Sequence, residues 1–600
     1  ERIIEDLESE QRRRRDDAIA KFEAFIRSYP GDAFYTSDAM FRLSELYFER
    51  SYDIYFQARQ QYDKAVEAWS PQAGGPEPIE PELHYEPTIA MMQRLITEYP
   101  NYRLVDGAYY LLGYCLGEQS EDERAVEVYE ELVSRFPTSR FAAEVWTRIG
   151  EYYFDSNELA RALMAYSQVL GHVDSPFYDK AMYKLAWTHY RLADPERAPE
   201  EFQKAVDTFV ELLDFHEKTK AEGHPRGGDL RAESLQYIAI CYADEQWGSL
   251  EKLETYLAKM GERAYSHDLM LALGDVYFDQ TRYEPAIAAY RLVQQRYPGA
   301  PDAPQTQEKI VTAHERNRDF AGAADARAQL TQTYSEGTTW HTANQASPDA
   351  IALAEDLIKK ALYSAALFHH KQAQVHKEAQ KIDLAKAEYE KAAAAYGEYL
   401  RRFPHDKQLY ELQFYYAECL YYSLQFEPAA LEYAKVRDSN ADNKFLEEAA
   451  FTVVLAYENA VKVAEASGVM APALVQKSTD RPADVAPTAR EIPALKVHVV
   501  EASDKFAAAA PNSDKVPKVL YKAAEIFYAY DHLEQARRRF EQILGAYPQH
   551  EVAEYASNLV IESYLAEKNF VAVEKFSRQL LEKPATPGRR EFKSDLVKFK

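Results

Sequence analysis

The sequence predicts an all-α fold, a right-handed solenoid of about ten to twelve helix pairs with some elongated helices and inserted loops. The first observation is a recurring spacing: a small residue, then alanine twelve residues later, an aromatic residue at sixteen and proline at twenty-four. The second is the composition of the 600 residues. Only 21 are glycine, which leaves few tight turns, and 45 are tyrosine, and this composition suits a chain that is mostly helical. Units that repeat in this way bury their apolar faces against their neighbours and therefore stack into a solenoid.

One copy of the spacing shows how each unit becomes two helices. Between Leu271 and Pro298, apolar residues lie at helical spacing around Gly274. Pro298 ends the second helix, because the residue before proline avoids helical angles. Small residues at Gly274 and Ala286 let the two helices approach, and a large side chain there would cost about 1–3 kcal/mol. Further strong copies begin at Gly113, Gly150, Ala417 and Ala524, and weaker ones centre on Ser44, Ala186, Ala239, Val311 and Ile561.

This pattern resembles the tetratricopeptide repeat, whose signature is W-x2-L-G-x2-Y, then A-x3-F and then P. Nearly all of that signature is carried by Trp146, Ile149, Gly150, Tyr153, Ala162 and Tyr166. The resemblance covers most of the chain, with gaps near 70–87, 214–230, 331–385 and 466–493. Its spacing of about 37 residues departs from the usual 34.

The second helices end in aromatic–proline pairs, such as Phe136-Pro137 and Tyr297-Pro298. These ends resemble the repeats of bacterial cell-envelope proteins of the outer-membrane assembly lipoprotein and division-coordinator type. The resemblance implies a periplasmic location, with an outer-membrane-associated one included. Because the sequence starts at Glu1 rather than Met, we also expect that a targeting or lipid-bearing segment preceded it, which leaves membrane attachment open.

The interruptions of the repeat predict the organisation of the chain. We expect an N-terminal array over 1–210 with an inserted loop near 70–87, a central array over 211–335, and elongated helices with further repeats over 336–465. A flexible linker or exposed loop over 466–493 then precedes the C-terminal repeats over 494–600. Elongated helices are expected from Ser44 to about Trp69, from Asp349 to about Ile382 and from Glu447 to about Ala466.

Charge and hydropathy narrow the classes of partner. A net charge of −26 disfavours nucleic acid, whose phosphates require lysine and arginine. No apolar run reaches the ~18–20 residues of a membrane-spanning helix. The expected partners are therefore other proteins or peptide segments.

No motif for nucleophilic catalysis, phosphate binding or metal binding occurs, so no catalytic residue, cofactor or metal is predicted. The stretch HHKQAQVH is interpreted as exposed polar positions on a long helix, because His369 and His376 lie two turns apart and cannot share one zinc ion. Each cysteine lies two residues after a small mark of the repeat, which predicts buried packing rather than disulfides: Cys115, Cys241 and Cys419.

The family resemblance implies a candidate binding surface on the first helix of each pair. Ligand-facing positions in this family lie at −6, −3, −2, +1, +4 and +5 around the small residue, on the concave side of the solenoid. Carried over, they predict a groove formed by Phe41, Phe48, Tyr110, Tyr114, Phe154, Tyr183, Lys184, Trp187, Tyr190, Arg191, Phe278, Phe414, Tyr415, Tyr421, Tyr521 and Tyr528. Any single aromatic residue is interpreted as packing between repeats, and the stripe as a whole as a binding surface. The window from Tyr183 to Arg191 is favoured, because it mixes aromatic with basic side chains.

The predicted function is a non-enzymatic scaffold that binds segments of partner proteins in the solenoid groove and organises a multi-protein assembly. The envelope resemblance implies outer-membrane assembly, secretion or motility machinery. Two alternatives stay open. One is a cytoplasmic co-chaperone or adaptor, and the other is a ligand-binding or enzymatic site built by the insertions around 70–87, 331–349 and 466–493.

Overall fold

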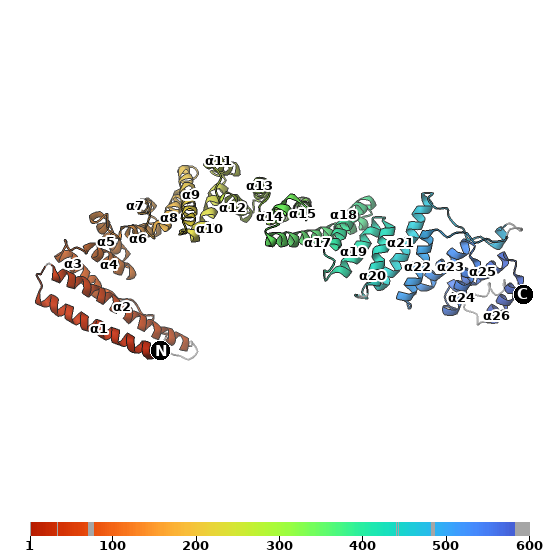
Figure 1. Ribbon diagram of the computed structural model, residues 1–600, viewed down its shortest axis with the longest axis horizontal. Helices are drawn as coiled ribbons and strands as arrows, with labels where there is room; N and C mark the ends of the chain where they lie inside the picture. Colours follow the sequence, from red (N-terminus) through yellow and green to blue (C-terminus); the bar gives the residue numbers. More distant parts are fainter. Residues whose placement is uncertain are drawn as a thin grey trace. The chain divides into compact units, whose positions relative to one another are not determined.

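The computed structural model describes residues 2–32, 34–69, 77–439, 441, 443–481 and 486–582, with side chains from residue 9 onward. Within these residues the chain forms 26 α-helices and no β-strand, apart from one isolated bridge between Asp194 and Ala198 (Figure 1). The predicted all-α class is therefore confirmed. Part of the predicted loop near 70–87 lies outside the described residues, which resume at residue 77.

The chain divides into two compact units, Glu1–Tyr297 and Pro298–Lys600. The helices of the first unit are α1 (Arg2–Ser28), α2 (Tyr35–Ala68), α3 (Glu86–Glu98), α4 (Val105–Glu118), α5 (Asp122–Arg135), α6 (Ala142–Asp155), α7 (Leu159–Val169), α8 (Tyr178–Leu192), α9 (Pro199–Ala221), the 3-10 turn η2 (Gly228–Leu230), α10 (Arg231–Ala243), α11 (Leu250–Met260), α12 (Ser266–Asp279) and α13 (Tyr283–Arg296). Those of the second unit are α14 (Ala303–Arg316), α15 (Phe320–Tyr334), α16 (Thr339–Ala343), α17 (Pro348–Glu378), α18 (Ile382–Arg402), α19 (Leu409–Tyr422), α20 (Phe426–Asp438), α21 (Leu446–Ala466), the 3-10 turn η3 (Ser478–Asp480), α22 (Ala494–Ala509), α23 (Val516–Ala529), α24 (Leu533–Ala546), α25 (Val552–Ala566) and α26 (Phe570–Glu582).

Successive helices form pairs, as the repeat predicts. Twelve pairs occur in the described part of the chain, from α2–α3 to α25–α26, with α1 before the first pair and the short α16 between two others. The predicted solenoid of helix pairs is confirmed, and its right-handed sense stays a prediction. The elongated first helices are also present, as α2, α17 and α21, although α17 ends at Glu378 rather than near Ile382.

The turn inside most pairs contains a left-handed residue that the repeat marks do not predict. Eight non-glycine residues that follow first helices adopt left-handed backbone angles, with φ between 58° and 67°: Ser120, Asn157, Thr281, Arg318, Gln380, Leu424, Asp531 and Lys568. At Thr281 two backbone N–H groups of the turn donate to carbonyls of the preceding helix: Thr281 N–H to Phe278 O (2.9 Å) and Arg282 N–H to Tyr277 O (2.8 Å). These bonds satisfy carbonyl groups that the helix end leaves open, which offsets the cost of the left-handed angle.

The small mark of the repeat is explained by its contact with the aromatic mark of the same pair. A Cβ atom added to Gly274 would lie 2.4 Å from the ring of Tyr290. The same closeness recurs between Gly113 and Tyr129 (2.4 Å) and between Gly150 and Tyr166 (2.5 Å). The ring therefore packs directly on the backbone of the first helix, which confirms the steric interpretation of the spacing and assigns the contact to the aromatic residue. We call this contact the seam.

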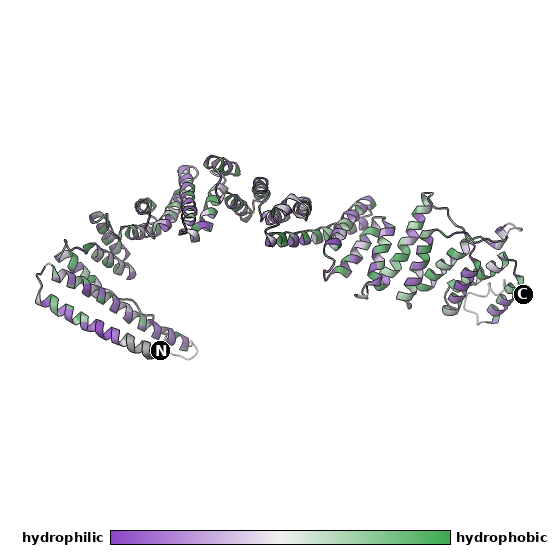
Figure 2. Cartoon of the chain, viewed as in Figure 1, coloured by the Kyte–Doolittle hydropathy of each residue, from purple (hydrophilic) through white to green (hydrophobic). Residues whose placement is uncertain are grey.

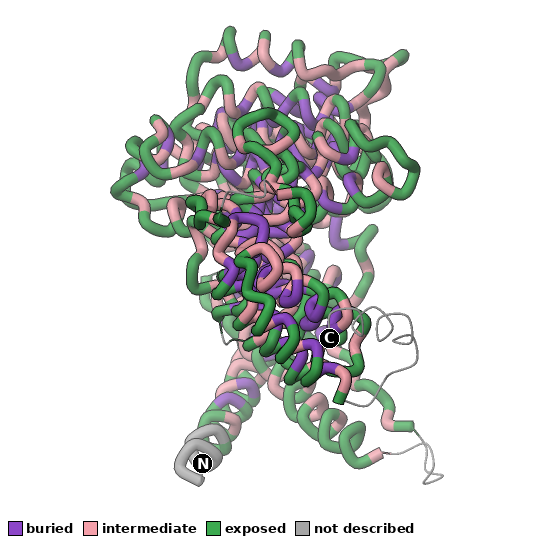
Figure 3. The backbone as a smooth tube through the Cα atoms, turned by 90° about the vertical axis from the view of Figure 1, so that its right-hand side faces the viewer, coloured by how far each residue is buried: buried purple, intermediate pink, exposed green. Residues whose placement is uncertain are grey.

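The core runs along the facing sides of the helices within each unit. Apolar and polar residues alternate around each helix (Figure 2), and buried positions gather where helices face one another (Figure 3). The three cysteines are free thiols and fully buried, as predicted. Burial raises the pKa of the Cys115 and Cys241 thiols to about 12, so both stay protonated and unreactive at neutral pH.

The histidine interpretation is wrong for one residue. His370 is buried, because its face of α17 packs against α18 and α19, where its ring lies near Tyr396 and Tyr415. Burial lowers the pKa of His370 to about 4, so this histidine is neutral at physiological pH. His369 is half-buried, and its Nδ1 lies 2.6 Å from the carboxylate of Glu388.

The described residues of the inserted connection between α21 and α22, within 467–481 and 486–493, are largely exposed and are bonded to later helices and turns. The Ser478 N–H donates to Glu562 on α25 (2.7 Å), and the Tyr528 hydroxyl of α23 donates to the Gln476 carbonyl (3.0 Å). Arg481 forms an ion pair with Asp531 (2.6 Å) in the turn after α23. The described residues of this connection thus lie over α23 and its neighbour α25.

Candidate binding groove

A cavity of about 710 Å³ opens between α1, α2 and α4 in the first unit. Three aromatic residues predicted from the sequence line it: Phe41 and Phe48 of α2 and Tyr110 of α4. Phe41 and Phe48 are seven residues apart, which places them on one face of the helix two turns apart. We call this cavity the groove. Its other lining residues are Ala18, Phe22, Arg42, Glu45, Leu46, Glu49, Gly107, Leu111, Arg140 and Phe141.

The shape of the groove depends on a glycine in its wall. A Cβ atom added to Gly107 would lie 3.4 Å from the Phe41 ring and 3.6 Å from the Phe141 ring, in ordinary contact with both. Residue 107 is thus close to both rings without a side chain of its own. A larger residue would extend from the wall and fill part of the cavity.

Ring stacking holds the aromatic side chains in place. Phe48 stacks on Tyr85, which precedes α3, at 4.8 Å between centroids and 7° between planes. Tyr110 stacks on Phe141, which precedes α6, at 4.3 Å and 9°. The Tyr110 hydroxyl also donates to Glu144 (2.8 Å). Burial is the larger cause and the Glu144 carboxylate the next of a rise in the Tyr110 pKa to about 12. The apolar wall is therefore preorganised, which lowers the entropy cost of binding.

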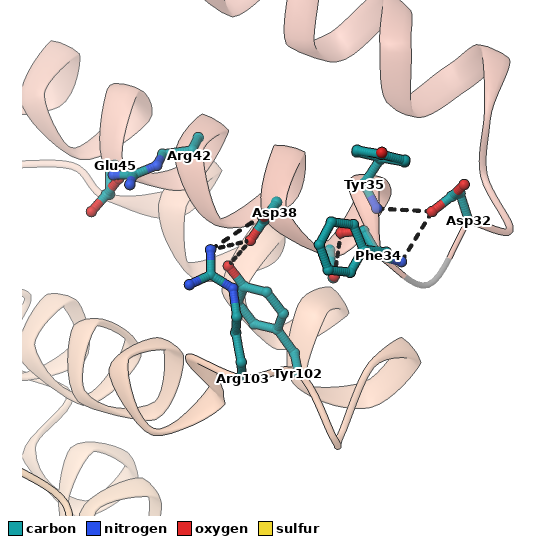
Figure 4. A network of polar contacts seen from close by, with 9 residues as sticks. Asp32, Phe34, Tyr35, Asp38, Arg42, Glu45, Tyr102 and Arg103 are labelled. Carbon is teal, nitrogen blue, oxygen red and sulfur yellow. Dashed lines mark hydrogen bonds and ion pairs between the residues drawn. The ribbon is translucent and has the colours of Figure 1, made fainter.

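Two polar residues of α2 that line the groove, Arg42 and Glu45, lie near a polar network between α2 and the turn before α4 (Figure 4). Arg42 and Glu45 form an ion pair at 2.7 Å. One turn earlier, Asp38 accepts from the Tyr102 hydroxyl (2.6 Å) and from Arg103 (3.0 Å), both in the turn before α4. These bonds, led by that of Tyr102, hold the pKa of Asp38 below its usual value. The network fixes the spacing of α2 and α4, and with it the width of the groove.

A second cavity of about 430 Å³ follows on the next repeat and is lined mainly by polar residues. Tyr114 of α4 lines it, and its ring lies 5.9 Å from the Phe48 ring that lines the groove. We call it the acidic cavity, because its lining includes four carboxylates: Glu118, Asp122, Glu151 and Asp155. Its arginine, Arg148, is bound to Glu144 (2.9 Å) and lies over the Tyr114 ring.

The favoured window from Tyr183 to Arg191 is a packed cluster between repeats. The Tyr183 hydroxyl donates to Glu233 of α10 (2.6 Å) and accepts from Trp187 Nε1 (2.9 Å). Trp187 and Tyr190 both contact the ring of Tyr237, at 4.6 and 5.7 Å. Lys184 and Arg191 cover the Phe154 ring of α6, at 5.2 and 4.5 Å. The predicted residues of this window therefore pack α8 against both α6 and α10.

Two predicted groove residues are buried in the second unit, which corrects their assignment to a surface. Phe414 is 5% exposed, because it stacks on Phe445 before α21 at 4.1 Å. Tyr528 is 0% exposed, because the inserted connection covers it. The remaining predicted residues are half-buried and each contacts a neighbouring aromatic ring: Phe278, Tyr415, Tyr421 and Tyr521.

Sequence reasoning missed the side of the groove that other elements supply. Ala18 and Phe22 come from α1, which precedes the first helix pair and carries none of the predicted groove residues. Phe141 precedes α6, and the register of ligand-facing positions does not include it. A signal was nevertheless present, since an aromatic residue stands just before several first helices: Phe141, Phe177, Tyr265 and Phe445.

The insertion around 331–349 contributes to a cavity of about 560 Å³ in the second unit, lined by Tyr334, Gly337 and His341 together with Arg401 and Arg402. No group of three or more histidine, cysteine, aspartate or glutamate side chains that could hold a metal ion occurs among the residues that the structure describes. No described helix is long and apolar enough to cross a lipid bilayer.

Comparison with known proteins identifies the repeat in four stretches of the chain. A sequence profile of the tetratricopeptide repeat matches residues 107–139, 268–300 and 518–550, and a second profile of the same repeat matches residues 147–209. The matched stretches contain the small marks at Gly113, Gly150, Gly274 and Ala524. No curated protein sequence matches the chain.

Similar solved structures are remote in sequence. The structure of Naa15/Naa10 bound to HypK-THB is 12% identical with a TM-score of 0.24, and the match covers 90% of this chain and 69% of that chain. The crystal structure of yeast Tom70 is 13% identical with a TM-score of 0.19, and the match covers 82% of this chain and 94% of that chain.

Proposed function

From the premise that the chain is a tetratricopeptide-repeat protein, we propose that it is a non-enzymatic scaffold whose groove binds an extended segment of a partner protein. The observation that carries this proposal is the 710 Å³ cavity lined by Phe41, Phe48 and Tyr110. Repeat solenoids present extended concave surfaces of this kind to other proteins. A chain with many such repeats can hold several partners and so organise an assembly.

The chemistry of the groove suits a large apolar side chain of the partner. Aromatic walls provide wide contact area, and burying one leucine- or phenylalanine-sized side chain contributes about 1.5–3 kcal/mol. Most of the rim is polar, with Arg42, Glu45, Glu49 and Arg140, so the groove combines an apolar centre with a hydrated edge. Interfaces between proteins commonly have this arrangement.

We further propose that the scaffold works in a bacterial cell envelope, in the periplasm or at the outer membrane, within assembly, secretion or motility machinery. The aromatic–proline ends of the second helices support this location, as at Tyr297-Pro298. Fractionation of source cells tests it. The protein is expected with the periplasmic or outer-membrane fraction, and recovery in the cytoplasmic fraction would overturn the location while leaving the groove proposal intact.

Site-specific crosslinking tests groove binding in the full chain. A photo-reactive phenylalanine at Leu46, which lines the groove, is expected to crosslink a partner segment from an extract of source cells. The same probe at Phe570, which is 65% exposed on α26, serves as the control.

A blocking variant makes the crosslink specific. Ala18→Trp places a large ring into the groove from α1, and is expected to abolish the Leu46 crosslink. Ala321→Trp, at an exposed position of α15, should leave it unchanged. Circular dichroism must show equal helix content in both variants. A Leu46 crosslink that survives Ala18→Trp would contradict binding in the groove.

A further inference from the structure

We infer that the groove takes a basic partner segment, in which a large apolar side chain lies a few residues from lysine or arginine. This inference rests on the proposed function and adds the chemistry of the partner. It is carried by the unpaired carboxylates of the acidic cavity, which lies next to the apolar wall of the groove.

The carboxylates beside the groove lack cations of their own. In the part of the chain that the structure describes, no lysine, arginine or histidine forms an ion pair with any of five acidic side chains at the groove and the acidic cavity: Glu49, Glu118, Asp122, Glu151 and Asp155. Other acids on the same helices are paired, as Glu45 is with Arg42 and Glu144 is with Arg148. Unpaired carboxylates therefore line the acidic cavity, and one more, Glu49, lines the groove next to it.

The acidic cavity keeps an excess of negative charge. Its arginine, Arg148, already binds Glu144 at 2.9 Å and covers the Tyr114 ring at 5.2 Å. It therefore compensates the four lining carboxylates incompletely. A lysine or arginine of the partner would supply the missing positive charge, whereas an acidic segment would be repelled. The net charge of −26 acts in the same direction at long range.

The two cavities are joined by aromatic contacts and set a spacing for the partner. Phe48 lines the groove, Tyr114 lines the acidic cavity, and their rings are 5.9 Å apart. Tyr110 and Glu118 are separated by eight residues of α4, which is about 12 Å along the helix axis. An extended chain rises about 3.3 Å per residue. The apolar anchor and the basic residue should therefore be about three to four residues apart.

Selection from a library of displayed random twelve-residue peptides tests the inference with the full chain. Peptides are selected on the wild-type protein and counter-selected on Ala18→Trp, so that groove-dependent peptides are identified. The expected result is enrichment of lysine or arginine three to four residues from an aromatic or large aliphatic residue.

Synthetic peptides then test the charges directly by fluorescence anisotropy. The paired change Glu118→Gln and Glu151→Gln should weaken binding of a selected basic peptide about tenfold at low salt, and less at high salt, because ion pairs are screened. The control pair Glu222→Gln and Glu251→Gln, at exposed positions outside both cavities, should leave the affinity unchanged. The thermal midpoint of both double variants must match the wild type.

The outcomes separate the two proposals. Groove-dependent peptides without basic enrichment, or with acidic enrichment, would overturn this inference and leave groove binding intact. Equal affinity of the wild type and the Glu118→Gln, Glu151→Gln variant would also overturn it. If no recovered peptide depends on the groove, both this inference and the proposed function fail.

Discussion

Two first helices carry aromatic residues at the same repeat positions and use them differently. Phe41 and Phe48 of α2 stand three residues before and four residues after the small mark, as Tyr521 and Tyr528 do on α23. The pair on α2 lines the open groove, whereas Tyr528 is fully buried. The difference comes from the inserted connection, whose Gln476 carbonyl accepts the Tyr528 hydroxyl. The repeat position sets the direction of a side chain, and the neighbouring elements decide whether it is available for binding.

The strongest test of this comparison truncates the covered ring. Tyr528→Ala should destabilise the second unit by about 3–5 kcal/mol, because a fully buried aromatic side chain leaves a cavity. Phe41→Ala, which removes a half-buried ring, should lower the denaturation midpoint less. Denaturant unfolding followed by circular dichroism measures both. Equal midpoints would mean that the two rings are equally covered.

The seam occurs in several helix pairs, and disturbing it should cause the next largest loss of stability. Gly113→Ala places a Cβ atom 2.4 Å from the Tyr129 ring, so the ring must move, at a cost of about 1–3 kcal/mol. Gly545→Ala on α24 is the matched control, because nothing lies within 4 Å of the added atom. A thermal scan should show a lower midpoint for Gly113→Ala only. A loss of stability in the control variant alone would show that the register is misplaced.

Loosening the cover over α23 should have a smaller effect. Arg490→Ala removes a side chain that binds the Ala529 carbonyl and Asp531, with a loss of about 1 kcal/mol. Proteinase K should then cleave the inserted connection faster than in the wild type. Lys477→Ala, an exposed change in the same connection, should leave the cleavage rate unchanged. Unaltered cleavage of Arg490→Ala would indicate that other contacts hold the cover.

The smallest expected effect on stability distinguishes an ion-paired carboxylate from one without an ion pair. The hydrogen bond from His267, together with Arg231, lowers the pKa of Asp268 from 3.8 to about 2. The folded carboxylate therefore contributes stability above about pH 4, and this contribution is lost as the pH falls toward 2. Asp268→Asn should lower the thermal midpoint slightly at pH 7, and the difference should shrink at pH 3. Glu118→Gln, an unpaired acid of the acidic cavity, should show no such loss.

Much of the fold could be predicted because its signals are local. The spacing of Gly274, Ala286 and Tyr290 records a contact inside one helix pair, and the structure shows it as the seam. The elongated helices α2 and α21 could be predicted from continuous helical periodicity. The left-handed turns could not, because residues such as Leu424 and Lys568 have no preference for that conformation.

The candidate site was predictable only in part. Phe41, Phe48 and Tyr110 belong to the register, and the structure brings them into one cavity. Phe22 and Phe141 complete that cavity from other elements, and no periodicity along α2 or α4 records them. The Tyr183 window shows the opposite error of prediction. The chemistry of its residues predicts a binding surface, but they pack against Tyr237 of another helix pair.

The sequence by itself determined the class of fold, the pairing of helices and the steric seam, since each depends on residues fewer than thirty positions apart. Only the tertiary structure decided which aromatic positions stay open. Coverage depends on contacts such as the one between Gln476 and Tyr528, 52 residues apart, and on rings supplied by helices before and after the one that carries the mark. Local spacing records contacts within a helix pair, whereas exposure is a property of everything that packs around it.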